Sequence, residues 1–457
     1  MKKGALIGLV CGIVVMGAAV IGATAAVVLN TPSVKVARGV SKLFAEAAEQ
    51  GEIFGEQFDF GKIQEIYGKG SYKNKVSVNM DIEGINDYAV SVDGTVLCDS
   101  INEKMNEEIK ISLAYYELLS IQMAVDKTDV YVDIPALYDG SIVFDSRNIG
   151  EQYNNSIFAE YADEEIADDF SLDFFNQTVY DTDSGVKELL ELIKNSEIKK
   201  DDSTVSAKVG SREVKCTGYL LTFKKDDINR FLKTLYADAE ETYEVRGDLE
   251  LLLYMDRKNN IRQIETKKAI VTGSMTDQIS VALRFAGETN VLETIKGKIN
   301  ALEDGSEIEV NFDYSGIREG RSYRQTLQCK AKSELTDLAA VDYSAVWDLE
   351  HAGYDMDIEV DVADKNYKME LGGSVETDAY RFDMNFDDCA LYMDREKVAG
   401  FDGSYSVEPL TEEIKIPSGE TRQIFEFSEL EFYSFVMEIA NRLEDSYDLL
   451  DNFGNLF

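Results

Sequence analysis

The sequence predicts a mainly β protein with helices (α+β), in which an N-terminal transmembrane helix precedes one or more large curved antiparallel sheets packed on amphipathic helices. Three observations support this prediction. Residues 4–29 carry no charged side chain. From Tyr72 to Phe386, apolar and polar residues alternate with a period of two in many short segments, which is typical of half-buried strands. Proline occurs only four times, so few strands are interrupted.

The charge balance excludes several classes of partner. The chain has 46 Lys and Arg against 86 Asp and Glu, which gives a net charge of −40. Nucleic-acid binding requires a basic face that neutralises phosphate, and we therefore expect no nucleic-acid partner. A polybasic membrane-surface patch is excluded for the same reason. A hydrophobic content of 44% is too high for a disordered acidic chain.

The uncharged run over residues 4–29 is predicted to contact the lipid bilayer as an uncleaved anchor, within an anchor segment 1–32. A helix of this length rises about 39 Å, enough to span a bilayer with some tilt. A cleaved signal peptide is the alternative, and Ala23-Thr24-Ala25 resembles a cleavage site, but the apolar core of a signal peptide is shorter. Lys2 and Lys3 precede the run, an order that favours a single-pass protein of the cell membrane with its bulk extracytoplasmic.

Small residues recur within this run. Gly4, Gly8 and Gly12 lie four residues apart and would form one stripe on a helix. Such stripes let two membrane helices approach closely, which predicts self-association through this segment. The alternative is that anchors are simply rich in glycine and alanine.

Period-two segments dominate the chain after a first helix predicted over 33–50. Strands are predicted from Tyr72 onward, with a turn at Asp93-Gly94, and near 105–115, 119–126, 129–134 and 141–146. A short helix carrying Val186 to Ile193 follows. Two further strands, near 204–209 and 213–223, then precede a helix that begins at Asp226 or Asp227.

The β pattern resumes after this helix. A turn at Asp256 to Asn260 separates strands near 249–253 and 261–272, and a strand near 277–286 follows. A short helix over 289–300 marks a candidate domain boundary. Strands near 308–314, 354–362 and 380–386 come next. Ser428 and Glu431 predict a capping box for a last helix.

The order of elements over 33–300 resembles the lipoprotein-carrier half-barrel (LolA/LppX-like) of extracytoplasmic proteins. The strand Glu213–Phe223 followed by a helix is similar to a step that recurs in such anchored proteins. The resemblance implies an antiparallel half-barrel with covering helices and an apolar cavity over 33–300. Residues 301–457 are then a second antiparallel β region that ends in a helix. The resemblance rests on the order of elements alone, and no site residue of that family is assigned to a position in this sequence.

The chain lacks the residue constellations of common enzymes, and we expect no catalytic residues, no cofactor and no metal site. His351 is the single histidine and falls in a predicted turn. Asp181 to Gly185 begins like a calcium loop, but Leu192 stands where the bidentate glutamate belongs. The acidic alternation Asp355 to Asp361 is read as a solvated strand face. Cys98, Cys216, Cys329 and Cys389 are read as buried thiols, with two disulfides as the alternative.

Residues 151–183 form the most unusual segment. They hold ten acidic residues and no Lys or Arg. One interpretation is a lid over an apolar cavity. The other is a loop whose aromatic residues fill the core of the sheet. The candidate lid residues are Phe158, Tyr161, Phe170, Phe174, Phe175 and Tyr180.

Two functions follow from these features. The first is a non-catalytic, membrane-anchored extracytoplasmic protein that binds a lipid or other apolar ligand. The second is a structural or protein-interaction module of the cell envelope without a small-molecule ligand. A cavity lined by apolar side chains favours the first, and a filled core with an exposed apolar patch favours the second.

Overall fold

The computed structural model describes residues 31–454, apart from 56, 83–88, 114–115, 163, 176–191, 193–194, 236–243, 273–276, 304–305, 334–335, 364 and 418. The described part is mainly β with some helices, as predicted. The chain divides into two compact units, which are described one at a time. Unit 1 comprises residues 1–57, 179–370 and 392–396, and unit 2 comprises residues 58–178, 371–391 and 397–457.

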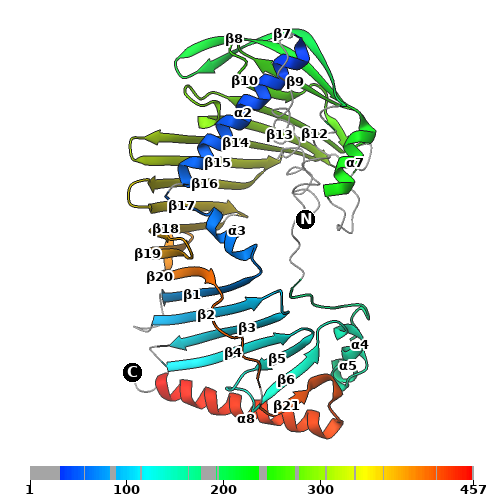
Figure 1. Ribbon diagram of the computed structural model, residues 1–457, viewed down its shortest axis with the longest axis vertical. Helices are drawn as coiled ribbons and strands as arrows, with labels where there is room; N and C mark the ends of the chain where they lie inside the picture. The colour runs from blue at the N-terminus through cyan, green and yellow to red at the C-terminus, as the bar shows by residue number, and fades with distance from the viewer. Residues whose placement is uncertain are drawn as a thin grey trace. The chain divides into compact units, whose positions relative to one another are not determined.

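Unit 1 is an antiparallel sheet with helices on one of its faces (Figure 1). Neighbouring strands pair in the order β7-β8-β9-β10-β12-β13-β14-β15-β16-β17, and β11 pairs with β12. The strands are β7 (Glu197–Val209), β8 (Arg212–Phe223), β9 (Leu249–Met255), β10 (Ile261–Thr266), β11 (Ile270–Thr272), β12 (Asp277–Phe285), β13 (Thr294–Glu303), β14 (Ser306–Glu319), β15 (Ser322–Ser333), β16 (Asp337–Asp348) and β17 (Gly353–Val362). The helices are α2 (Pro32–Gly55), α7 (Lys225–Leu235) and the short 3-10 helix η2 (Val291–Glu293).

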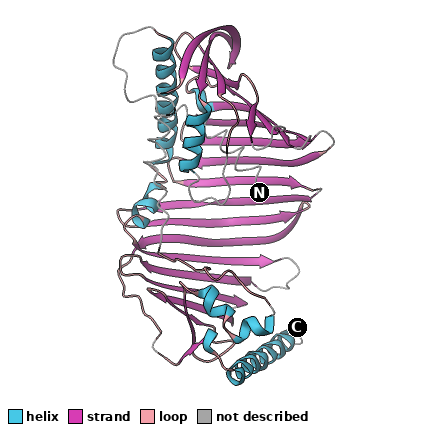
Figure 2. Cartoon of the chain, turned by 90° about the vertical axis from the view of Figure 1, so that its right-hand side faces the viewer, coloured by secondary structure: helices cyan, strands magenta, loops and turns pink. Residues whose placement is uncertain are grey.

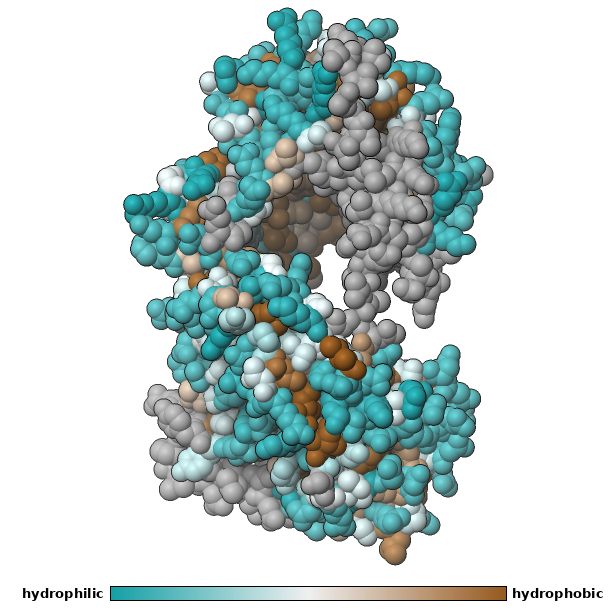
Figure 3. Space-filling view, in the orientation of Figure 1, coloured by the Kyte–Doolittle hydropathy of each residue, from teal (hydrophilic) through white to brown (hydrophobic). Residues whose placement is uncertain are grey.

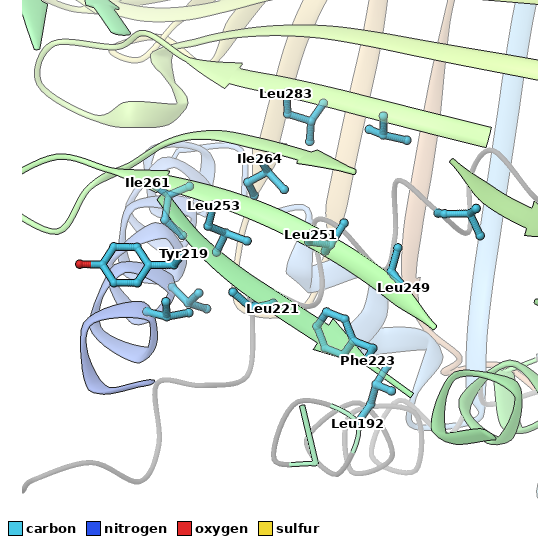
Figure 4. Packing of buried hydrophobic residues seen from close by; sticks show 14 of the residues in the cluster. Leu192, Tyr219, Leu221, Phe223, Leu249, Leu251, Leu253, Ile261, Ile264 and Leu283 are labelled. Atoms are coloured by element: carbon cyan, nitrogen blue, oxygen red, sulfur yellow. The ribbon is translucent and has the colours of Figure 1, made fainter. Parts of the chain in front are cut away.

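The core of unit 1 lies between α2 and strands β8 to β13. Val36 and Val40 of α2 are fully buried, as the helical spacing predicts. They pack with the apolar face of the strands, where Leu251, Leu253 and Ile264 point to the same side (Figure 4). Val245, before β9, accepts and donates hydrogen bonds with the Asn229 side chain of α7, which fixes that helix beside the strands.

Unit 2 is a second antiparallel sheet in the order β20-β1-β2-β3-β4-β5-β6, with β21 parallel to β6. Figure 2 distinguishes its strands from its helices. The strands are β1 (Ser71–Ile82), β2 (Ala89–Asp99), β3 (Lys104–Leu113), β4 (Tyr116–Asp126), β5 (Asp129–Asp133), β6 (Ser141–Asp145), β20 (Glu396–Pro409) and β21 (Thr421–Gln423). The helices are α3 (Gly61–Tyr67), α4 (Ile149–Asn154), α5 (Ile157–Ala162), η3 (Ile424–Glu426) and α8 (Glu429–Gly454). β18 (Lys365–Thr377) and β19 (Phe382–Met393) contribute residues to both units.

The capping box at the start of α8 is confirmed. The backbone N–H of Ser428 donates to Glu431 Oε2 at 2.8 Å, and the N–H of Glu431 donates to Ser428 Oγ at 3.4 Å. The two side chains thereby satisfy N–H groups that the first turn of a helix leaves unpaired.

Two local predictions are wrong. Asp93 and Gly94 lie inside β2 and pair with Ser77 and Val76 of β1. The alternation of Val90, Val92, Val96 and Cys98 continues through this dipeptide, and sheet pairing overrides the turn preference. The predicted helix over 289–300 is η2 followed by β13, because residues 295, 297, 299 and 301 alternate toward the apolar face. The predicted boundary at residue 300 therefore falls inside a strand.

The predicted anchor over residues 4–29 and most of the predicted helix near 186–193 lie outside the described residues. Within the described part of the chain, no helix combines the length and apolar character needed to cross a membrane.

Candidate functional site

Strands β13 to β17 of unit 1 share one continuous apolar face. The strand register places Phe312 opposite Cys329, Cys329 opposite Val341, and Val341 opposite Val360. A neighbouring row contains Tyr314, Leu327, Tyr343 and Ile358. Side chains on adjacent strands at such positions contact each other directly. The face is thus built from two complete rows of apolar and aromatic side chains that cross four strands.

This face is less covered than the rest of the sheet. On β9 to β12 the equivalent residues are fully buried, and Leu283 is an example at 3% exposure. On β13, Ile299 is buried at 4% exposure whereas Ile295 is half-buried. On β14 to β17 the members of both rows are only half-buried. Figure 3 shows a hydrophobic hollow over these strands. An apolar sheet face normally packs against another layer, so a half-buried one is a candidate binding surface.

The end of helix α2 closes this face on one side. The ring of Phe54 contacts Tyr323 and Trp347 edge-on, with centroid distances of 5.2 Å to each. Tyr323 and Trp347 are opposite each other on β15 and β16 and are both buried. The covered part of the face therefore ends near the row that contains these two residues, and the half-buried rows begin four residues farther along each strand, at Leu327 and Tyr343.

A polar network separates the covered part from the half-buried part. Trp347 Nε1 donates to Gln325 Oε1 at 2.9 Å, and the Tyr343 hydroxyl donates to the same oxygen at 3.3 Å. Gln325 Nε2 donates to the Tyr314 hydroxyl at 3.4 Å. Burial raises the pKa of Tyr343, so its hydroxyl stays protonated. The network satisfies a glutamine that would otherwise carry an unpaired amide among apolar side chains.

A pocket of about 400 Å³ lies beside this network. Gly316 and Tyr323 line it, together with Glu49 and Glu52 of α2. Gly316 has no side chain, and a Cβ there would lie 2.4 Å from the Tyr314 hydroxyl oxygen, so glycine leaves room for the tyrosine. The apolar rows therefore end at a more polar recess.

The opposite face of the same strands has the reverse chemistry. Lys296 pairs with Asp313, Lys298 pairs with Glu309, and Gln328 Nε2 donates to Asp342 at 2.8 Å. Lys368 Nζ lies 3.5 Å from Asp357. These cross-strand pairs are largely exposed, and each contributes little stability. One face of these strands is therefore apolar and the other is charged. Because adjacent residues of a strand point to opposite faces, the same substitution at two neighbouring positions tests one face against the other.

Cys329 lies in the middle of the half-buried apolar rows. The four cysteines of the body are free thiols, and Cys98, Cys216 and Cys389 are buried whereas Cys329 is half-buried. Burial raises the pKa of the Cys329 thiol, which lowers its thiolate fraction at neutral pH. The reactivity of its thiol can therefore be used to measure whether a ligand covers this face.

Unit 2 has an apolar face of the same kind. Val78, Val92, Ile111 and Leu119 lie in one row across β1 to β4 and are half-buried. A brown stripe in Figure 3 marks hydrophobic residues over these strands. At one end, the Tyr67 and Tyr405 hydroxyls lie 2.8 Å apart, and Asn74 Nδ2 donates to Tyr67 at 2.7 Å.

The candidate lid residues fall into three groups. Phe158 and Tyr161 lie on α5 and pack against Phe432, with centroid distances of 5.1 and 5.0 Å. Phe170 is 46% exposed, and Phe174 and Phe175 are half-buried in a bend. Tyr180 lies outside the described residues. The lid role stays a prediction.

Within the described part of the chain, the residues considered above as candidates for catalysis or metal binding do not come together in one site. His351 Nδ1 lies 2.8 Å from Asp348 in an exposed turn, and this contact raises the histidine pKa. Asn366 Nδ2 of β18 donates to Glu359 and Asp361 of β17 at 2.7 Å, which occupies part of the acidic alternation on that strand. No three His, Cys, Asp or Glu side chains gather at a metal-binding distance in the described part. The calcium-like loop at 181–185 falls outside it.

Sequence reasoning missed the half-buried face and its Gln325 network. The signal was present in the alternation of Tyr323, Gln325, Leu327 and Cys329, and in Val341, Tyr343, Ala345 and Trp347. Alternation shows that a strand has an apolar face, but it does not show whether a helix covers that face.

No protein-family model and no curated protein matches this chain. Similar solved structures include the low-pH structure of OprB from Pseudomonas putida, at 7% identity and a TM-score of 0.25, covering 76% of this chain and 96% of that one. A LolA-superfamily protein from Nitrosomonas europaea is 13% identical with a TM-score of 0.14, covering 56% of this chain and 90% of that one. A loop-deletion mutant of OmpT, an outer membrane protein of Vibrio cholerae, is 8% identical with a TM-score of 0.13, covering 74% and 97%. Scores this low assign no family.

Proposed function

We propose that this protein binds a lipid or other apolar ligand on the half-buried face of β14 to β17, without catalysing a reaction. The observation that carries the proposal is the contrast within one sheet. The same apolar face is buried under α2 and α7 on one side and half-buried over the Phe312 and Tyr314 rows on the other. An apolar chain lying there would remove surface from water, at roughly 25 cal/mol for each Å² covered.

The shape of the site suits an elongated ligand. The two apolar rows run across β14 to β17, and the Gln325 network and the pocket beside Gly316 lie at their end. A ligand with an apolar chain and a small polar end would match both parts. Binding pockets for such molecules are mainly apolar with a few placed polar groups.

Membrane anchoring is part of the same proposal. The uncharged run 4–29 has the length of a membrane span, and Lys2 and Lys3 precede it. The body would then lie on the extracytoplasmic side of the cell membrane. Extraction of membranes with alkaline carbonate tests this, because an anchored chain stays in the pellet and a cleaved one is released. N-terminal sequencing of the pelleted chain would show whether Met1 is retained.

The test of ligand binding uses a charge placed on one face or the other. Leu327 lies on the apolar face, and Thr326 is its exposed neighbour on the opposite face. Residues 31–457, which include every described element, are titrated with cis-parinaric acid, whose fluorescence rises in apolar surroundings. Leu327→Glu should weaken binding about tenfold or more, since a carboxylate would be buried by the ligand.

Thr326→Glu is the matched control and should bind as the unchanged chain does. Equal binding by both variants, or no binding by the unchanged chain, would contradict the proposal. Because Leu327→Glu also changes a packed residue, Leu327→Ala provides a second variant. Its unfolding midpoint shows whether lost affinity comes from lost folding.

The second candidate is a protein-interaction module of the cell envelope. It is favoured by apolar side chains that unit 2 exposes on helix α8, among them Leu430 at 77% exposure and Met437 at 58%. Absence of any bound apolar probe would favour this function.

A further inference from the structure

The apolar face of the unit 2 sheet contains a carboxylate. Glu107 lies on β3, opposite Val96 of β2 and Met123 of β4. Because side chains alternate between the two faces of a strand, Glu107 points to the same face as Ile109 and Ile111. Within the described strands β1 to β4, every other residue on this face is uncharged. Glu107 is therefore the exception in an otherwise consistent pattern.

The charge of Glu107 has no partner. Its side chain is half-buried and makes no ion pair or hydrogen bond within the described part of the chain. The next residue, Glu108, points to the opposite face, where it pairs with Lys110 at 2.8 Å and accepts from Gln122 Nε2 at 3.1 Å. Covering an unpaired carboxylate with apolar groups is unfavourable, so neither a plain hydrocarbon nor a fatty acid suits this position.

A purely protective role does not explain Glu107. Charged residues that point inward can protect the edge of a sheet from pairing with other chains. β3 is not an edge strand, because it pairs with β2 on one side and with β4 on the other. An unpaired charge on a central strand therefore points to recognition of a ligand.

The same cross-strand row contains a second acceptor without a donor. Val96 lies between Glu107 and Asn74 of β1. Asn74 Nδ2 donates to the Tyr67 hydroxyl at 2.7 Å, but Asn74 Oδ1 is buried and has no hydrogen-bond partner among the described residues. Buried polar atoms in proteins are nearly always paired. The row thus has unpaired acceptors on both sides of Val96.

Glu107 lies where the cover of this face ends. Cys98 and Val125, two residues farther along β2 and β4 from its neighbours, are buried. In the other direction, Ile109 and Ile121 are half-buried. An apolar chain that covers the half-buried rows would therefore bring one of its ends to Glu107.

We propose that the apolar face of unit 2 binds a molecule in which an apolar chain carries an ammonium group. The chain covers Ile109 and Ile111, and the ammonium pairs with Glu107. Hydrogen bonds between charged groups are roughly twice as strong as neutral ones, and the net charge of −40 attracts cations to the protein. A metal ion fits less well, because no three His, Cys, Asp or Glu side chains gather around one point in the described residues. The inference does not rest on ligand binding by unit 1.

The test measures how fast single carboxyl groups react. The full chain, in the nonionic detergent dodecyl maltoside, is treated with a water-soluble carbodiimide and ethanolamine, which convert accessible carboxyls into amides. Peptide mass spectrometry follows Glu107 and Glu108 separately. Dodecyltrimethylammonium is the cationic probe, and dodecanol is its uncharged counterpart. Rising concentrations of the cationic probe should slow the reaction of Glu107 about tenfold or more, because only unoccupied chains react.

Glu108 is the internal control, since it is adjacent in sequence but lies on the opposite face. Its reaction rate should be the same with either probe, and dodecanol should slow the reaction of Glu107 much less than the cation does. Equal slowing of both residues by the cation, or equal slowing of Glu107 by the cation and the alcohol, would overturn the proposal.

A second measurement compares Glu107→Gln with Glu108→Gln, which remove the same charge from opposite faces. Glutamine has nearly the shape of glutamate, so both variants should fold. The cationic probe should raise the thermal unfolding midpoint of the unchanged chain and of Glu108→Gln, because a ligand that binds the folded state stabilises it. Glu107→Gln should show little or no rise. An equal rise in both variants would contradict the assignment of the ammonium to Glu107.

Discussion

Asp256 shows how single side chains hold the turns of this protein. Its Oδ1 accepts from the backbone N–H groups of Lys258 and Asn260 at 2.8 and 2.9 Å. Its Oδ2 accepts from Arg262 Nε at 3.2 Å, and Arg262 also donates to the Gly287 carbonyl at 2.8 Å. Both side chains of this ion pair are about 95% buried, with exposures of 5% and 6%. The pair connects the β9–β10 turn to the loop after β12.

We predict that Asp256→Ala destabilises unit 1 by about 3–5 kcal/mol, because it leaves the Arg262 guanidinium buried without its partner. Urea unfolding measures the change. Glu319→Ala is the matched control, because its pair with Arg324 at 3.1 Å is exposed, and we expect a change within about 0.5 kcal/mol. Similar losses in the two variants would contradict this.

The same carboxylate predicts a pH dependence. Burial acts to raise the pKa of Asp256, but hydrogen bonds from Asn260, Lys258 and Arg262 outweigh it and lower the pKa below 3.8. The stabilisation is complete above the ordinary pKa and is lost as the pH falls through the lowered pKa of the folded state. The stability difference between the unchanged chain and Asp256→Ala should therefore be constant near neutral pH and shrink in acid. A difference that persists at low pH would be contrary to this expectation.

At the scale of elements, the sequence predicts existence and type well and boundaries less well. The alternation of β1, β14 and β17 and the capping box of α8 were sufficient to place those elements. The predicted turn at Asp93-Gly94 and the predicted helix over 289–300 were wrong, because local turn and helix preferences were weaker than pairing with neighbouring strands. A helix packed on the sheet is predicted, but how far α2 covers the sheet is not, since the extent of the cover depends on contacts distant in sequence.

The aromatic residues of the predicted lid segment differ in how closely they pack against the rest of unit 2. We predict that Phe158→Ala lowers the stability of unit 2 by roughly 2 kcal/mol or more, because its ring contacts Phe425, Phe427 and Phe432. Phe170→Ala should change stability little, because Phe170 is 46% exposed. Thermal unfolding of the two variants measures both effects. Equal and small losses would mean that α5 is not anchored by this aromatic cluster.

At the scale of the whole molecule, each unit is an antiparallel sheet with one apolar face that its described helices cover in part. The net charge of −40 and the alternating faces are readable from sequence. The incomplete cover over β14 to β17 is not, because residues such as Leu327 and Val341 have the same pattern as the buried Leu251 and Ile264. Periodicity identifies which side chains share a face, and only the fold determines how far a second layer extends.

The most direct test of the central claim is the reactivity of Cys329. Residues 31–457 are alkylated with a maleimide, with and without cis-parinaric acid, and each cysteine is followed by peptide mass spectrometry. The half-buried Cys329 should react faster than the buried Cys98, Cys216 and Cys389. The fatty acid should slow the reaction of Cys329 about tenfold or more, as expected when a bound chain covers the thiol. Probe binding that leaves the rate at Cys329 unchanged would contradict the claim that this face is the binding site.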